Sequence, residues 1–190
     1  MNESAARNAT GNNATAMLTK AGEDQFLTFL LGGEEYGVDI LRVQEIRGWD
    51  GATAIPNTPD YVLGVINLRG IVVPIVDLRK RFKLSEANFD AATVVVVVNV
   101  IYEGSERVMG AVVDGVSDVY NFSADDISDA PDLGIKISTE VVKGFAMADD
   151  KMIIILDIDK LITLGLLDNV EISSAGFIEE LSGEPDNTEK

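Results

Sequence analysis

The sequence predicts a mostly β fold, in which two similar small β subdomains pack together and share one core. Three observations predict it. Short runs rich in β-branched residues alternate with turn signals, segments of the first half recur about 80 residues later, and 46% of the 190 residues are hydrophobic. A chain of this length can bury a sizeable core, whereas half of it could not bury a generous one.

Eight segments have the β-branched and aromatic composition typical of strands. They comprise residues 25–31, 35–39, 43–48, 64–67, 71–77, 93–102, 107–114 and 151–157. Gly32-Gly33 and Glu103-Gly104-Ser105 fit hairpin turns between neighbouring segments. Because residues 94–98 are all valine, we expect this run to be buried on both faces of its sheet. Short strands with such turns are typical of small barrels or sandwiches.

A repeat with an offset of 80 residues relates the two halves of the chain. Residues 58–64 align with residues 138–144, and the same offset relates two of the predicted strands. Each aligned segment begins with an N-cap residue, has an acid in its first turn and ends at a glycine, Gly64 or Gly144. This pattern predicts a short helix before each glycine. The period is too long for a solenoid and indicates two subdomains.

The two copies differ most in one loop. Residues 67–70 read Asn-Leu-Arg-Gly, whereas residues 147–150 read Met-Ala-Asp-Asp. A cation on a glycine-ended turn in one copy and two acids in the other suggest a surface that only the first copy offers. Sequence drift in a solvated hairpin is the alternative interpretation.

Charge and composition exclude several functional classes. Asp and Glu number 32 against 15 Lys and Arg, which gives a formal net charge of −17. This charge repels phosphate backbones and anionic lipids, so we expect no nucleic-acid partner. The chain has no Cys and no His, which removes thiol nucleophiles, zinc–thiolate sites and the commonest general base. An enzyme of this sequence would have to rely on carboxylates, Lys or Tyr.

The ends differ from the middle in composition. Residues 1–24 have neither the apolar nor the basic segment of a secretory signal and are expected to form a disordered tail. Residues 25–167 are expected to form the folded domain, and residues 168–190, with seven acids and one Lys, an acidic tail. No apolar run approaches the ~18 residues that a membrane span needs. The chain is therefore expected to be cytoplasmic, with no direct membrane insertion.

The polar segments next to the predicted strands have structural interpretations. Asp77 and Asp157 each follow a strand and are expected to cap short helices, with a divalent-metal site as the less favoured alternative. Ser123 and Asp126 resemble a capping box. The basic segment 79–83 is interpreted as a solvated helix face, and a docking site for an acidic partner is the alternative. Nucleotide-binding and hydrolase motifs are absent, so no catalytic residue, metal or cofactor is expected.

Glu45 and Arg69 have a different character. Glu45 lies in an alternating stretch and Arg69 in the loop that distinguishes the two copies. As an exposed ion pair they would add only ~0–1 kcal/mol to stability. Their neighbours are apolar, which favours a binding surface with an apolar centre and polar groups that set the register. These neighbours are Val43, Ile46, Ile66 and Leu68.

Six segments resemble the signature segments of the bacterial chemotaxis coupling (CheW-type) proteins, in order, over residues 25 to 162. They are Gln25-Phe-Leu-x-Phe, Glu34-Glu-Tyr-Gly-Val-Asp-Ile, Val43-Gln-Glu-Ile-Arg-Gly, Gly64-Val-Ile-Asn-Leu-Arg-Gly, Val73-Pro-Ile-Val-Asp-Leu-Arg and Val112-Val-Asp-Gly-Val-Ser-Asp-Val. The resemblance implies two SH3-like five-stranded β-barrel subdomains packed on a shared hydrophobic core, with short helices and a C-terminal helix.

The same resemblance implies a non-catalytic scaffold that works without a cofactor. Its implied partners are the regulatory domain of the chemotaxis histidine kinase and the cytoplasmic tips of methyl-accepting, transmembrane chemoreceptors. The protein would then be recruited from the cytoplasm to membrane-associated receptor arrays.

The resemblance also implies partner-binding residues. Val43, Glu45, Gly64 and Arg69 are expected at positions where substitution disrupts partner binding, and Glu45 and Arg69 belong to the segment tied to receptor and kinase coupling. The apolar residues Ile40, Ile46, Ile66 and Leu68 are expected to help line a receptor groove between the subdomains.

Two alternatives remain open at this point. One is the adaptor module of a hybrid coupling protein that is normally fused to a receiver domain, although about 23 residues after the folded domain are too few for a receiver. The other is a carboxylate-dependent metal enzyme that uses the Asp149/Asp150 or the Asp157/Asp159 pair.

Overall fold

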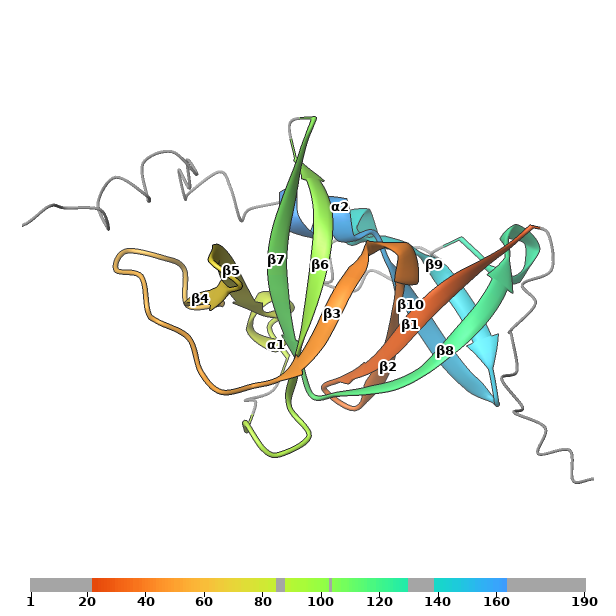
Figure 1. Ribbon diagram of the computed structural model, residues 1–190. Helices are drawn as coiled ribbons and strands as arrows, with labels where there is room; N and C mark the ends of the chain where they lie inside the picture. Colours follow the sequence, from red (N-terminus) through yellow and green to blue (C-terminus); the bar gives the residue numbers. More distant parts are fainter. Residues whose placement is uncertain (1–21, 85–87, 103, 130–138, 164–190) are drawn as a thin grey trace, which may run out of the picture.

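The computed structural model describes residues 22–84, 88–102, 104–129 and 139–163. Ten strands account for most of this part of the chain, and short helical turns join them (Figure 1). The elements in chain order are β1 (Glu23–Leu31), β2 (Glu34–Asp39), the 3₁₀ turn η1 (Ile40–Arg42), β3 (Val43–Gly48), β4 (Val62–Leu68), β5 (Ile71–Asp77), α1 (Leu78–Arg81), β6 (Val94–Tyr102), β7 (Ser105–Val113), β8 (Gly115–Ser123), η2 (Ala124–Asp126), η3 (Thr139–Val141), β9 (Val142–Ala148), β10 (Lys151–Leu156) and α2 (Ile158–Thr163).

The strands form two five-stranded sheets that lie side by side (Figure 1). The sheet that we call barrel A has the order β8-β1-β2-β10-β9, and the sheet that we call barrel B has the order β3-β6-β7-β5-β4. The expected fold class, mostly β with two SH3-like subdomains and short helices, is confirmed. The last described helix is α2, directly after β10.

The two sequence repeats are not the two barrels. The strands β1–β5 correspond in order to β6–β10, but barrel A combines β1 and β2 with β8, β9 and β10. Barrel B combines β6 and β7 with β3, β4 and β5. Each repeat therefore contributes two strands to one barrel and three to the other. The sequence repeat alone did not predict this exchange.

The exchange explains why the barrels share a core. The largest cluster of buried residues joins Phe29 and Tyr36 of barrel A with Val96 and Val98 of barrel B. Tyr36 also stacks on Phe82, which follows α1, with ring centroids 5.9 Å apart. Burial raises the pKa of the Tyr36 phenol, and the charge of Glu34 adds to the shift. Each barrel has in addition a smaller core of its own.

Most predicted strands are confirmed, including the valine run. Val95 to Val98 are all buried, because alternate side chains face the shared core and the core of barrel B. The strands β8 and β9 were not among the predicted segments. The helix predicted before Gly64 is wrong, because residues 62–68 pair with β5 instead. Before Gly144 only the turn η3 precedes β9.

Gly64 and Gly144 instead lie where each barrel closes. Thr53, beyond the end of β3, pairs with Val65 next to Gly64, and Ser128, beyond the end of β8, pairs with Phe145 next to Gly144. A Cβ atom on Gly64 would overlap the carbonyl oxygen of Thr53. On Gly144 it would lie 2.6 Å from that of Ser128. Both glycines are needed because another chain segment passes directly over them.

The predicted caps are confirmed, but the basic segment is not a solvated face throughout. Asp77 accepts a hydrogen bond from the backbone N–H of Arg79 at 2.9 Å, and Asp157 accepts one from that of Lys160 at 3.1 Å. Asp126 accepts from both the backbone N–H and the hydroxyl of Ser123. The Arg79 side chain, however, is only 2% exposed. It turns inward to pair with Asp77 rather than outward to water.

Candidate partner-binding site

The hairpin between β4 and β5 carries Arg69 at its tip. Arg69 and Gly70 form the turn with positive φ values of 52° and 89°, and the side chain of Asn67 accepts a hydrogen bond from the Gly70 N–H at 2.8 Å. This short turn holds the backbone of Arg69 at the surface. The turn formed by Asn-Leu-Arg-Gly therefore holds one cation at a defined position.

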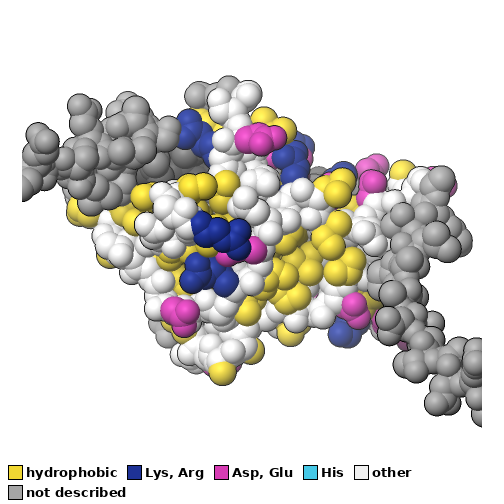
Figure 2. Space-filling model, in the orientation of Figure 1, with side chains coloured by type: hydrophobic (Ala, Val, Ile, Leu, Met, Phe, Trp, Pro, Cys, Tyr) yellow, Lys and Arg dark blue, Asp and Glu magenta, His cyan; other side chains and the backbone are white. Residues whose placement is uncertain are grey.

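Arg69 pairs with Glu45 of β3, and its guanidinium Nη2 lies 2.8 Å from Glu45 Oε2. The Arg69 side chain is 83% exposed, whereas that of Glu45 is 23% exposed. Glu45 thus orients a guanidinium that is still available to a partner. A bulge in the pairing of β3 with β6, between Val43 and Glu45, sets which face Glu45 occupies. Figure 2 shows basic side chains beside an acid near the middle of this face.

An apolar surface adjoins these charges. Figure 2 shows hydrophobic side chains gathered over the region where β3 of barrel B meets β1 and β8 of barrel A. The exposed large apolar side chains of these three strands are Ile46, Leu30 and Val116, which are 44%, 40% and 37% exposed. Ile40 and Val43 are half-buried and pack against the shared core. Ile40 and Val43 therefore lie beside the core that the two barrels share, and Ile46 is exposed on the same strand as Val43.

Two residues predicted for that groove lie elsewhere. Leu68 is buried, 8% exposed, in the core of barrel B, and Ile66 packs against the same core. The alternation of β4 with β5 directs Leu68 inward. The prediction that Leu68 lines a groove between the barrels is therefore wrong, and Ile66 belongs to barrel B alone.

Gly64 is also buried and is not on the binding surface. Its φ of 133° and its position under Thr53 make it a residue of barrel closure. A substitution of Gly64 would therefore act on partner binding through the shape of barrel B. Of the eight predicted site residues, Arg69 and Ile46 are exposed, Glu45, Ile40, Val43 and Ile66 are half-buried, and Gly64 and Leu68 are buried.

The equivalent hairpin of barrel A has a different chemistry. Asp149 at its tip accepts a hydrogen bond from the Tyr120 hydroxyl of β8 at 2.9 Å. That hydrogen bond, followed by burial and nearby acids, raises the pKa of Tyr120. Asp157 is a helix cap, and among the described residues no three acidic side chains gather where a metal ion could bind. One residue of each pair considered for a metal enzyme, Asp149 or Asp157, thus has another partner.

One pair of residues was missed as a candidate for the site. Arg42, directly before β3, forms an ion pair with Asp159 of α2, with 2.6 Å between Nη2 and Oδ2. Nothing in the sequence joins positions 117 residues apart. The repeat could have drawn attention to Asp159, because it occupies in the second copy the position that Arg79 occupies in the first.

Two intertwined five-stranded barrels, with an exposed ion pair beside an apolar seam, define a protein that presents a surface to other proteins. The sequence matches the profile of the CheW-like domain over residues 25–165. This chain belongs to the CheW-like family of chemotaxis scaffold proteins, which are adaptors and not enzymes.

Individual relatives agree with this assignment. The chain is 48% identical to the chemotaxis protein CheW of Klebsiella aerogenes over 149 residues, 77% of this chain and 87% of that protein. It is 39% identical to CheW of Rhizobium meliloti, over 77% of this chain and 92% of that protein. The structure resembles the crystal structure of the scaffolding protein TtCheW from Thermoanaerobacter tengcongensis, with a TM-score of 0.67, 34% identity and coverage of 75% of this chain and 90% of that one.

No helix within the described residues has the length and apolar character to cross a membrane.

Proposed function

We propose that this scaffold couples transmembrane chemoreceptors to a chemotaxis histidine kinase. In this proposal it works in the cytoplasm, binds the receptors at their cytoplasmic tips and binds the kinase through its regulatory domain. Its recruitment to membrane-associated arrays follows from the first contact. Its own chemistry is confined to recognition, with no cofactor or metal ion.

The observation that carries the proposal is the Glu45–Arg69 pair beside the apolar seam. An exposed ion pair of this kind contributes little to stability, about 0–1 kcal/mol, so its value lies in recognition. Arg69 is held by its turn and by Glu45 at 2.8 Å, which lowers the entropy lost when a partner binds it. Ile46 and the neighbouring seam supply apolar area next to the cation.

We assign the receptor to the seam between the barrels and the kinase to the β4–β5 hairpin. A receptor tip is a helical hairpin, and an apolar helix face fits a groove between two barrels, where Ile40, Val43 and Ile46 lie. Arg69 on the β4–β5 hairpin is exposed and available to a second protein. We infer that the kinase regulatory domain contacts this hairpin and Glu45.

A binding titration tests the proposal. The purified chain is titrated with a kinase regulatory domain and, separately, with a receptor tip, each at several salt concentrations. We expect Arg69→Glu to weaken kinase binding by tenfold or more, because it places two acids together and removes the cation. Lys83→Glu is the matched control, since it makes the same charge change at an exposed position of barrel B. Equal affinities of wild type and Arg69→Glu would remove the hairpin from the interface.

A further inference from the structure

The described chain passes from one barrel to the other at two places. It leaves barrel A between β2 and β3, through η1, and it returns from barrel B between β7 and β8, at Asp114. We call these two crossovers the links between the barrels. The contacts of the links determine how the two barrels pack against one another. Each link is held by an ion pair to the short helix that follows a neighbouring strand.

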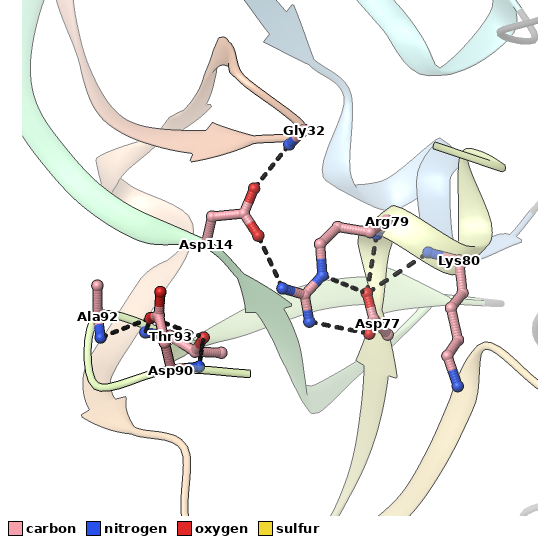
Figure 3. Close-up of polar contacts among 8 residues, drawn as sticks. All are labelled: Gly32, Asp77, Arg79, Lys80, Asp90, Ala92, Thr93 and Asp114. Carbon is pink, nitrogen blue, oxygen red and sulfur yellow. Dashed lines mark hydrogen bonds and ion pairs between the residues drawn. The ribbon is translucent and has the colours of Figure 1, made fainter. Parts of the chain in front are cut away.

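The link at Asp114 is held by a buried cation, Arg79 of α1 (Figure 3). The Arg79 side chain of α1 donates to Asp114 Oδ1 at 2.7 Å and to both oxygens of Asp77 at 3.1 Å. Asp114 Oδ2 accepts from the N–H of Gly32, in the β1–β2 turn, at 2.7 Å. Burial alone would lower the pKa of Arg79, but the hydrogen bonds and charges of Asp77 and Asp114 outweigh it and raise the pKa. The cation of this link is therefore charged and buried, whereas the Asp114 side chain is 33% exposed.

The link at η1 has the same design with the charges reversed. Asp159 of α2 binds Arg42 through Oδ2 at 2.6 Å, and its Oδ1 accepts from the N–H of Ile101, near the end of β6, at 2.7 Å. Asp159 thus connects this link to the β6–β7 hairpin of barrel B, whereas at the other link Asp114 itself binds the β1–β2 hairpin. Both partners, however, are 29% exposed.

The exposure of the Arg42–Asp159 pair affects β3, because this strand begins at the residue after Arg42. Val43 is the first residue of β3, and Glu45 follows two residues later. The carboxylate of Asp159 therefore fixes the chain directly before the strand that carries the binding surface. Salt screens this pair more than the pair at Asp114, because the Arg79 cation there is only 2% exposed.

We infer that Arg42 and Asp159 are positioning residues for partner binding: their ion pair holds β3 against barrel A, and Arg79 with Asp114 is the fixed connection at the other link. The consequence for binding rests on the proposed function. The inferred position of β3 does not rest on the proposed function, so the position and its consequence for binding can be tested separately.

The first experiment measures the position of β3 without a partner. Because the sequence has no Cys, spin labels can be attached to cysteines that replace Gln44 on β3 and Met152 on β10, both exposed. We expect Arg42→Gln to shift or broaden the distance distribution between the labels, and Arg42→Lys to restore it. Lys160→Gln removes the ion pair of α2 with its cap residue Asp157, which does not cross between barrels, and it should have no effect. An unchanged distribution in Arg42→Gln would overturn the inference.

The second experiment measures affinity for the kinase regulatory domain. We expect Arg42→Gln to weaken binding by roughly three- to tenfold, with Arg42→Lys close to wild type. A fall in affinity with no change in distance would make Arg42 a direct contact and overturn the positioning role. A changed distance with unchanged affinity would also overturn that role. If wild type bound no kinase domain, the proposed function would fail while the distances still decided the position of β3. Emission from Trp49, the single tryptophan, reports whether the core of barrel B is intact.

Discussion

Arg69 and Asp149 occupy equivalent positions at the tips of two equivalent hairpins, with φ values of 52° and 49°. Each contacts the strand at the matching place in its own barrel, Arg69 through Glu45 of β3 and Asp149 through Tyr120 of β8. The backbone geometry is thus kept while the charge at the tip is reversed. The two hairpin tips therefore carry opposite charges, which favours different partners at the two tips.

Replacement of Arg69 should separate binding from stability. In Arg69→Gly the left-handed backbone no longer carries a side chain, which offsets the greater freedom of the unfolded chain. We expect the free energy of unfolding in urea to change by less than about 1 kcal/mol, while kinase binding is lost. A loss of several kcal/mol would mean that the side chain is structural.

We expect Gly64 to stabilise the protein by allowing Thr53 to close barrel B. In Gly64→Ala the new Cβ overlaps the Thr53 carbonyl at a φ of 133°, so we expect a loss of at least about 2 kcal/mol of unfolding free energy. Gly70→Ala is the control, because its φ is also positive at 89° but no atom lies within 4 Å of the added Cβ. It should cost about 1 kcal/mol. Similar losses in the two variants, measured by urea unfolding, would exclude the overlap as the cause.

The buried pair of Asp77 and Arg79 should be among the most sensitive positions for stability. Arg79→Met leaves the Asp77 carboxylate, which is fully buried, without its cation. We expect a loss of about 3–5 kcal/mol in unfolding free energy. Lys80→Met, at an exposed position of the same helix, should cost less than about 0.5 kcal/mol. If Arg79→Met were as stable as Lys80→Met, the link at Asp114 would not hold the barrels.

The hydrogen bond of Tyr120 should be visible in its titration. The pKa of the phenol is raised above 10.0, mainly because it donates to Asp149. A raised pKa in the folded state means that the stability from this contact is present below pH 10 and is lost as the pH rises through the raised pKa. Asp149→Asn should move the pKa down towards its ordinary value, as measured by NMR of the Tyr120 ring. An unchanged pKa in that variant would contradict the contact.

The strands and the binding pair were predictable to different degrees. Alternation and valine content located most strands, because a buried pleated surface selects those residues. β8 was missed because five of its nine residues are polar or glycine and only one of the nine is buried. The Gly64 segment was misread as a helix, and the Gly144 segment has only the 3₁₀ turn η3, because an N-cap residue and a glycine also fit a turn that enters a strand. Leu68 was placed on the surface because its neighbour Arg69 is there.

The sequence by itself determined the β class, the internal repeat, the family and the loop in which Arg69 stands, because these depend on local composition and spacing. Tertiary structure alone decided which strands share a barrel, since strand pairing depends on packing between residues far apart in the chain. The same holds for the pairs Arg79–Asp114 and Arg42–Asp159, 35 and 117 residues apart. Their oxygens and nitrogens meet only because the repeats exchange strands and bring the two links between the barrels next to α1 and α2.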